Sequence, residues 1–184
     1  MNWPTWLPIR NDLRSFSPYG APQIKDVVQL NTNENPFELP DEVQNALRAR
    51  IESELSTLNR YPDRDALALR RKLGEYLGGL PAEMIWAANG SNEILQTLNL
   101  AFGGAGAKAI GFTPSYSVHP LIAAITGTHW IAGKRGENFE IDINSAVNQI
   151  EHEKPTLVFI TTPNNPTGTL TSITVLEKLA EASA

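Results

Sequence analysis

The chain has 184 residues, no cysteine and a formal net charge of −5. This length allows one substantial domain with a hydrophobic core and is marginal for two. Because there is no cysteine, disulfides, thiolate metal sites and a cysteine nucleophile are excluded, and we predict no metal site. The acidic balance, without any basic cluster, argues against nucleic acid or an anionic membrane as a partner.

The N-terminal sequence lacks the features of a secretory signal. It reads MNWPTWLPIRNDLRSF, without a basic start followed by an apolar run. No apolar stretch approaches the roughly 20 residues that a membrane-spanning helix needs. We therefore expect a cytoplasmic protein.

Residues 1–80 divide into an arm and a helical segment. Residues 1–40 are rich in proline and lack a periodic apolar pattern, so we expect an extended arm. Over residues 41–80, apolar residues recur at helical spacing. The pattern predicts one helix over 43–55 and a second helix, capped by Asp63, over 67–77.

Residues 81–184 alternate between strand and helix patterns. Strands are predicted over 84–87, 107–112, 129–132 and 156–160, and helices over 94–102, 118–126, 142–150 and 172–183. The alternation predicts an α/β fold whose mostly parallel sheet is covered by helices on both faces. Since the sequence stops on a helix, we expect a strand–helix unit of a longer protein to be cut off there.

Three loops that follow predicted strands carry polar or aromatic residues. In residues 89–92, the backbone N–H groups of Gly90, Ser91 and Asn92 precede a helix and could bind a phosphate. In residues 113–119, Tyr116 offers a flat aromatic surface beside His119. The asparagines of residues 163–168 could donate to an anionic oxygen. Each loop also has a purely structural explanation: a capped helix, buried core side chains, or turn chemistry.

The position of the three loops strengthens the case for a ligand. In a parallel sheet the ends of the strands share one rim, where ligands bind in α/β folds. A phosphate seat, an aromatic surface and an amide donor around one crevice suit a flat, phosphorylated, heteroaromatic ligand. The glycines of residues 103–106, in contrast, precede a strand, so they indicate a helix stop and loop rather than a dinucleotide site.

The order of several motifs resembles a known family. The chain is similar to the N-terminal half of the fold-type I, pyridoxal-phosphate-dependent aminotransferases of class I/II, and most of all to the histidinol-phosphate aminotransferases. PNNPTG is common to the class, whereas LNTNENP, RYPD and GSNE together are much more specific to the histidinol-phosphate group. The matching pieces are SPYGAPQ (17–23), LNTNENPF (30–37), NRYPD (59–63), NGSNE (89–93), PSYSVHP (114–120) and PNNPTG (163–168).

The resemblance implies a fold and a set of cofactor contacts. The fold would be an N-terminal arm (1–40), a helical segment (41–80) and a truncated part (81–184) of the family's three-layer α/β/α large domain. The contacts implied for pyridoxal 5′-phosphate are Gly90, Ser91 and Asn92 on the phosphate, Tyr116 stacked on the ring, Asn165 on the phenolic oxygen, His119 behind the ring, and Tyr61 on the phosphate of the neighbouring subunit of a homodimer.

The resemblance also implies a reaction. Histidinol phosphate and 2-oxoglutarate would exchange an amino group in histidine biosynthesis, with the cofactor as the electron sink. The substrate would be closed in by an arm that contains Tyr19, Asn33, Glu34 and Asn35.

No lysine of the chain lies in the family's Ser-Lys context, well downstream of PNNPTG. We therefore expect this chain to be the N-terminal part of the enzyme and inactive by itself, without the Schiff-base lysine. With the sheet incomplete, we also expect self-association, through exchanged segments or aggregation. Two alternatives stay open at this point. One is a related enzyme: another class I/II aminotransferase, for example one for aromatic amino acids, or a related decarboxylase of a phosphate substrate. The other is a non-catalytic folded remnant that binds phosphate or a partner.

Overall fold

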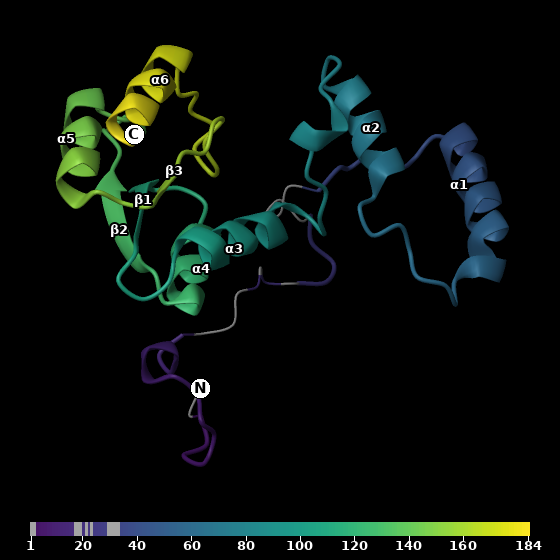
Figure 1. Ribbon diagram of the computed structural model, residues 1–184, viewed down its shortest axis with the longest axis horizontal. Helices are drawn as coiled ribbons and strands as arrows, with labels where there is room; N and C mark the ends of the chain where they lie inside the picture. Colours follow the sequence, from purple (N-terminus) through teal and green to yellow (C-terminus); the bar gives the residue numbers. More distant parts are fainter. Residues whose placement is uncertain (1–2, 17–19, 21, 23, 29–33) are drawn as a thin grey trace. The chain divides into compact units, whose positions relative to one another are not determined.

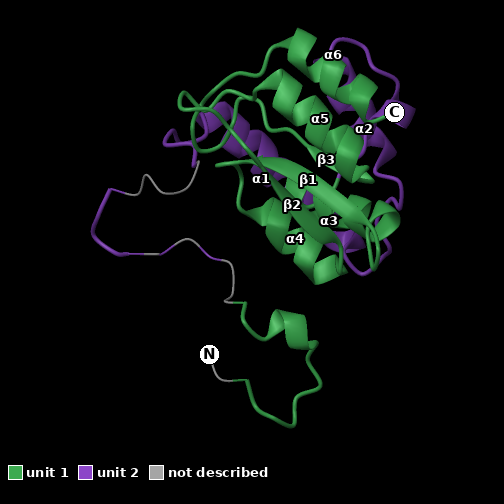
Figure 2. Cartoon of the chain, turned by 90° about the vertical axis from the view of Figure 1, so that its left-hand side faces the viewer, with its two compact units in different colours: residues 1–18, 88–184 green, residues 19–87 purple. Residues whose placement is uncertain are grey.

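The computed structural model of the chain describes residues 3–16, 20, 22, 24–28 and 34–184. The chain forms two compact units (Figure 2), one made of Met1–Pro18 and Ala88–Ala184 and the other of Tyr19–Ala87. We call them the sheet unit and the helical unit and describe each by itself. Among the helices of the described residues, none is long and apolar enough to cross a membrane.

The sheet unit is built on three parallel strands. They are β1 (Lys108–Thr113), β2 (His129–Lys134) and β3 (Leu157–Phe159), in the order β2-β1-β3. In the register of the sheet, Ile110 of β1 lies opposite Ile131 of β2 and Val158 of β3. The predictions of these three strands and of a parallel sheet are confirmed.

Helices cover both faces of this sheet. Figures 1 and 2 show α3 (Ser91–Phe102) and α4 (Val118–Thr126) on one face, and α5 (Ile143–Glu153) and α6 (Ile173–Ala182) on the other. The predicted three-layer α/β/α arrangement is therefore confirmed. Right-handed crossovers between parallel strands place helices on the faces of such a sheet, which explains why the central strand β1 is buried from Ala109 to Phe112.

The main hydrophobic core lies between the sheet and the α5/α6 layer. Side chains alternate along a strand, so Ile110 and Phe112 of β1 point to this face together. The buried members of the cluster are Ile110, Phe112, Ile141, Ala146, Ile150 and Leu179. Burying a side chain of this size contributes about 1.5–3 kcal/mol, so the cluster is the principal source of stability.

The other face of the sheet is lined by aromatic residues. Gly111 of β1 leaves room for the Trp130 ring, since a Cβ at residue 111 would lie 2.5 Å from an atom of that ring. Phe159 of β3 lies 6.1 Å from Trp130 between ring centroids. The small residue in the central strand thus allows two large rings from the flanking strands to approach each other.

Side-chain caps start α5 and α6 where the sequence predicted them. Asp142 Oδ1 accepts a hydrogen bond from the Ser145 N–H at 2.7 Å. Ser172 Oγ accepts one from the Val175 N–H at 3.3 Å. Each cap satisfies a backbone donor that the first turn of a helix leaves free.

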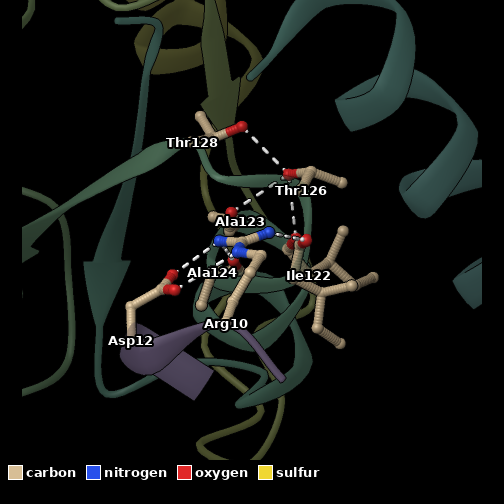
Figure 3. Close-up of polar contacts among 8 residues, drawn as sticks. Arg10, Asp12, Ile122, Ala123, Ala124, Thr126 and Thr128 are labelled. Atoms are coloured by element: carbon tan, nitrogen blue, oxygen red, sulfur yellow. Dashed lines mark hydrogen bonds and ion pairs between the residues drawn. The ribbon is translucent and has the colours of Figure 1, made fainter. Parts of the chain in front are cut away.

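The N-terminal segment is attached to the end of α4 by one arginine. Arg10 donates to the carbonyl oxygens of Ala124 (3.0 Å) and Ile125 (2.7 Å), and it pairs with Asp12 (Figure 3). The last carbonyls of a helix carry partial negative charge, so a guanidinium there is stabilising. The short 3₁₀ helix Asn11–Leu13 follows this contact, in a segment that was predicted to be an extended arm.

The helical unit contains the two predicted helices. They are α1 (Asp41–Glu54) and α2 (Leu67–Tyr76). The 3₁₀ turn Leu55–Thr57 follows α1, and the 3₁₀ turn Ala82–Met84 follows α2. The N-cap residue of α2 is Ala66. Asp63 nevertheless accepts hydrogen bonds from the N–H groups of Leu67 (2.8 Å) and Asp65 (3.1 Å), so its side chain satisfies the first N–H of the helix as predicted. Arg70 ties α2 to the following turn through the carbonyls of Ala82 and Ile85, both at 2.7 Å.

The predicted strand over residues 84–87 does not form. Met84 ends a 3₁₀ turn, and Ile85 has an extended backbone with φ −112° and ψ 126°. In the described part of the chain no strand pairs with this segment. The prediction was wrong because an apolar pattern can favour an extended backbone, while a strand also needs a partner to bond its N–H and C=O groups.

Candidate active site

Three loops meet at the edge of the sheet where the strands end. The Asn164 Nδ2 group, in the loop after β3, donates to the Pro114 carbonyl after β1 at 3.1 Å. The Tyr116 hydroxyl donates to Asn92 Oδ1, at the start of α3, at 3.2 Å. These contacts join the three loops that the sequence singled out into one site of the sheet unit.

The first loop leads into α3 and presents backbone donors. Gly90 has φ +78° and precedes a helix that no side chain caps. The N–H groups of Ser91 and Asn92 have no acceptor among the described residues. The expectation that the Gly90 N–H is also free was wrong, since it donates to the Ala88 carbonyl at 2.8 Å. Glu93 turns away from these donors and accepts from the Asn89 N–H at 2.6 Å.

The second loop carries Tyr116 and His119. The Tyr116 ring is half-buried and meets the His119 ring edge-on, with 5.5 Å between centroids. His119 is 7% exposed and stacks on Phe159 at 4.9 Å and 20° between the ring planes. Burial lowers the pKa of His119, because desolvation disfavours the imidazolium. A neutral, buried imidazole therefore lies behind the more exposed tyrosine.

The third loop turns sharply after β3 and presents Asn165. The Gly168 N–H donates to the Asn164 carbonyl at 2.7 Å, and the Asn164 N–H donates to the Thr169 carbonyl at 2.8 Å. Asn165 is half-buried, and its amide has no hydrogen-bond partner among the described residues. The turn therefore holds its backbone closed while leaving one amide side chain to bond another group.

Sequence reasoning missed the importance of Asn164 and Ser115. Asn164 is 2% exposed, and its Oδ1 accepts from Ser115 Oγ at 2.8 Å. The two adjacent asparagines of the loop read alike in the sequence, so nothing there distinguished the buried one. The available signal was Ser115, whose hydroxyl lies directly before Tyr116 and could form a hydrogen bond to a neighbouring loop.

The remaining predicted residues belong elsewhere. Tyr61 lies in the helical unit and is fully exposed, at 102%. Glu34 and Asn35 are exposed in the same unit, where Asn35 Oδ1 accepts from the Phe37 N–H at 3.1 Å. Tyr19 and Asn33 lie outside the described residues. None of these five residues takes part in the contacts given for the three rim loops among the described residues.

The donor set of the rim suits a ligand with an anionic end and a flat ring. Two backbone N–H groups at the start of a 12-residue helix can bind a phosphate, helped by the helix dipole. Ser91 and Asn92 are both exposed residues at this helix start. An aromatic face at Tyr116 and a free amide at Asn165 complete the set.

The family of the chain follows from its similarity to known sequences. The profile of the family described as "Aminotransferase class I and II" matches residues 25–184. Since this match covers most of the chain, the chain belongs to the class I and II aminotransferases.

Individual relatives narrow the comparison. A histidinol-phosphate aminotransferase of Thermobifida fusca is 51% identical over 179 residues, which are 96% of this chain and 48% of the relative. The chain thus spans about half the length of this curated relative.

Solved structures share the fold. A variant of aspartate aminotransferase from Thermus thermophilus has a TM-score of 0.76 at 21% identity, covering 95% of this chain and 47% of that one. Histidinol-phosphate aminotransferase from Sinorhizobium meliloti, in complex with pyridoxal 5′-phosphate, has a TM-score of 0.66 at 19% identity, covering 76% and 37%. The sheet unit and its helices therefore have the fold-type I architecture that the sequence predicted.

Proposed function

We propose that this chain is the N-terminal part of a pyridoxal-phosphate-dependent aminotransferase that transfers the amino group of histidinol phosphate to 2-oxoglutarate. The observation that carries the proposal is the joining of three rim loops by the Tyr116–Asn92 and Asn164–Pro114 hydrogen bonds. The 51% identity to a histidinol-phosphate aminotransferase supports the choice of substrate. Histidine biosynthesis in the cytoplasm is the corresponding role.

The rim residues have distinct tasks in this proposal. The N–H groups of Ser91 and Asn92 bind the cofactor phosphate, and the conformation of Gly90 exposes them. The Tyr116 ring stacks on the cofactor ring, and the Asn165 amide donates to its phenolic oxygen. Bound pyridoxal 5′-phosphate supplies the electron sink that lets a proton leave the substrate Cα.

His119 supports this arrangement from behind. Its ring lies between Tyr116 and Phe159, at 5.5 and 4.9 Å from their centroids. Burial keeps the imidazole of His119 neutral. The ring can therefore pack against the aromatic residues without placing a positive charge below the cofactor. We propose that it holds the group that contacts the pyridine nitrogen.

Residues outside the rim complete the proposal. Tyr61 would bind the cofactor phosphate of the second subunit in a homodimer, which agrees with its full exposure. Tyr19, Asn33, Glu34 and Asn35 would close over the imidazole and phosphate ends of the substrate.

We further propose that the chain alone has no transaminase activity. Lys108 pairs with Glu153 at 2.9 Å and begins β1, at the opposite end from the rim. Lys134 ends β2 and is exposed. It is therefore the lysine at which we would look for an adventitious adduct with pyridoxal 5′-phosphate. Neither lies in the sequence context that the family uses for its catalytic lysine.

A chimera tests the proposed activity directly. Residues 1–184 of this chain would replace the matched half of the 51% identical Thermobifida fusca relative. We expect transamination of histidinol phosphate with 2-oxoglutarate, and a loss of at least tenfold in kcat/KM with Asn165→Ala, since one charge-assisted hydrogen bond contributes about 1.5–3 kcal/mol. A folded chimera that prefers phenylalanine or tyrosine as the amino donor would contradict the choice of substrate.

A further inference from the structure

One buried asparagine fastens the loop after β1 to the loop after β3. Asn164 is 2% exposed although it lies in a polar turn. Its Oδ1 accepts from Ser115 Oγ at 2.8 Å, and its Nδ2 donates to the Pro114 carbonyl at 3.1 Å and to Thr167 Oγ1 at 2.7 Å. A buried amide with this many partners is held in one orientation.

The backbone of Asn164 is fixed as well. Its N–H donates to the Thr169 carbonyl, and its carbonyl accepts from the Gly168 N–H. The third loop is therefore closed on itself at Asn164, and the side chain of the same residue reaches across to the second loop. Ser115 Oγ also lies 3.4 Å from Thr161 Oγ1, next to the end of β3.

The hydrogen bond between Ser115 and Asn164 links the second loop to the third. Each of the two residues proposed to contact the cofactor ring directly follows one of these two residues in the sequence. Tyr116 follows Ser115, and Asn165 follows Asn164. We propose that Asn164 is a positioning residue, which sets the spacing between the Tyr116 ring and the Asn165 amide without touching the ligand itself. The role assigned to this spacing rests on the proposed function, whereas the link between the loops does not.

The chemistry of an amide is what this position requires. Asn164→Ala would remove the buried amide to which Ser115 Oγ donates and which donates to the Pro114 carbonyl. Asn164→Asp would keep an acceptor for Ser115 but would set a carboxylate oxygen against the Pro114 carbonyl. Both substitutions should therefore separate the loops, and Ser115→Ala should weaken the link from the other side.

Hydrogen exchange on the 184-residue chain tests the link without any ligand. The amides of Arg135 and His119 donate to the carbonyls of Thr113 and Tyr116, so they report on the second loop. The amides of Asn164 and Gly168 report on the third loop, because they donate to the carbonyls of Thr169 and Asn164. In Asn164→Ala we expect at least tenfold faster exchange at both pairs and unchanged exchange in the centre of β1. The Ser115→Ala variant should show the same pattern.

Ligand titrations test the positioning role. Pyridoxal 5′-phosphate would contact all three loops, whereas inorganic phosphate needs only the donors at the start of α3. We expect Asn164→Ala to weaken binding of pyridoxal 5′-phosphate about tenfold and to leave binding of phosphate unchanged. Asn165→Ala is the matched control, one residue away: it should weaken binding of pyridoxal 5′-phosphate without altering exchange in the second loop.

The outcomes separate this inference from the proposed function. Unchanged exchange at Arg135 and His119 in both Asn164→Ala and Ser115→Ala would overturn the link. Faster exchange throughout β1 would show a general structural role and would overturn positioning, as would an equal loss of affinity for both ligands. If the wild-type chain binds no pyridoxal 5′-phosphate, the proposed cofactor site fails, and the exchange data alone decide whether Asn164 sets the loop spacing.

Discussion

The two units of the chain form helices equally well but differ in what those helices bury. In the sheet unit, α4, α5 and α6 bury apolar residues such as Ile122, Ile150 and Leu179. In the helical unit, α1 has no buried residue, and its apolar residues Val43, Leu47 and Ile51 are 42–61% exposed. Apolar periodicity therefore predicts that a helix forms. How much that helix stabilises the fold depends on a second layer against which it can pack.

The largest expected effect compares two isoleucines in helices. Ile150 in α5 is 1% exposed, and Ile51 in α1 is 61% exposed. We expect Ile150→Ala to lower the free energy of unfolding by about 2–5 kcal/mol, because it leaves a cavity in the core. Ile51→Ala should change it by less than about 0.5 kcal/mol. Urea unfolding of the 184-residue chain measures both variants, and an equal loss from Ile51→Ala would contradict the exposure of Ile51.

The next effect is a pH dependence that arises from His119 in the sheet unit. Burial lowers the pKa of His119 from 6.5, so the unfolded chain binds a proton at a pH where the folded chain does not. Stability is therefore complete above pH 6.5 and falls as the pH drops below it, by at most about 1.4 kcal/mol per pH unit. Melting curves between pH 5 and 8 check this. His119→Gln should flatten the profile, and a profile that this substitution leaves unchanged would contradict the account.

A smaller effect compares helix caps in the two units. Asp142 caps α5 at 2.7 Å from the Ser145 nitrogen, and Asp63 caps the start of α2 at 2.8 Å from the Leu67 nitrogen. Asp142→Ala should lower the free energy of unfolding by about 1 kcal/mol. Asp63→Ala should mainly loosen the first turn of α2, visible as faster amide exchange at Leu67. Unchanged exchange at Leu67 in Asp63→Ala would contradict the capping contact.

The smallest effect concerns the N-terminal segment. Arg10→Ala removes the contacts to the Ala124 and Ile125 carbonyls, so residues 3–16 should become sensitive to protease while the sheet unit melts as before. Arg50→Ala, which breaks an exposed ion pair with Glu54 in α1, is the matched control and should leave this cleavage unchanged. Protection of residues 3–16 in Arg10→Ala would show that other contacts hold the segment.

Local signals in the sequence were enough to predict most helices and the parallel strands. Asp142 and Ser172 start α5 and α6 as predicted, because capping depends on neighbours three residues away. The strand predicted at 84–87 failed, because strand formation depends on a partner distant in the sequence.

The site was predicted less completely than the fold. The order of the motifs indicated Tyr116, His119 and Asn165, but the Gly90 N–H is occupied by a carbonyl two residues earlier. The role of Asn164 depends on a contact across 49 residues to Ser115, which no local pattern reveals.

The central claim is that the three rim loops form one seat for pyridoxal 5′-phosphate. The most direct measurement is equilibrium dialysis of the 184-residue chain with this cofactor, followed by borohydride reduction and intact mass. We predict reversible binding that Tyr116→Ala and Asn165→Ala each weaken about tenfold, with an unchanged mass after reduction. An affinity for pyridoxal 5′-phosphate that neither substitution changes, or a reduced adduct on a single lysine such as Lys134, would contradict the account.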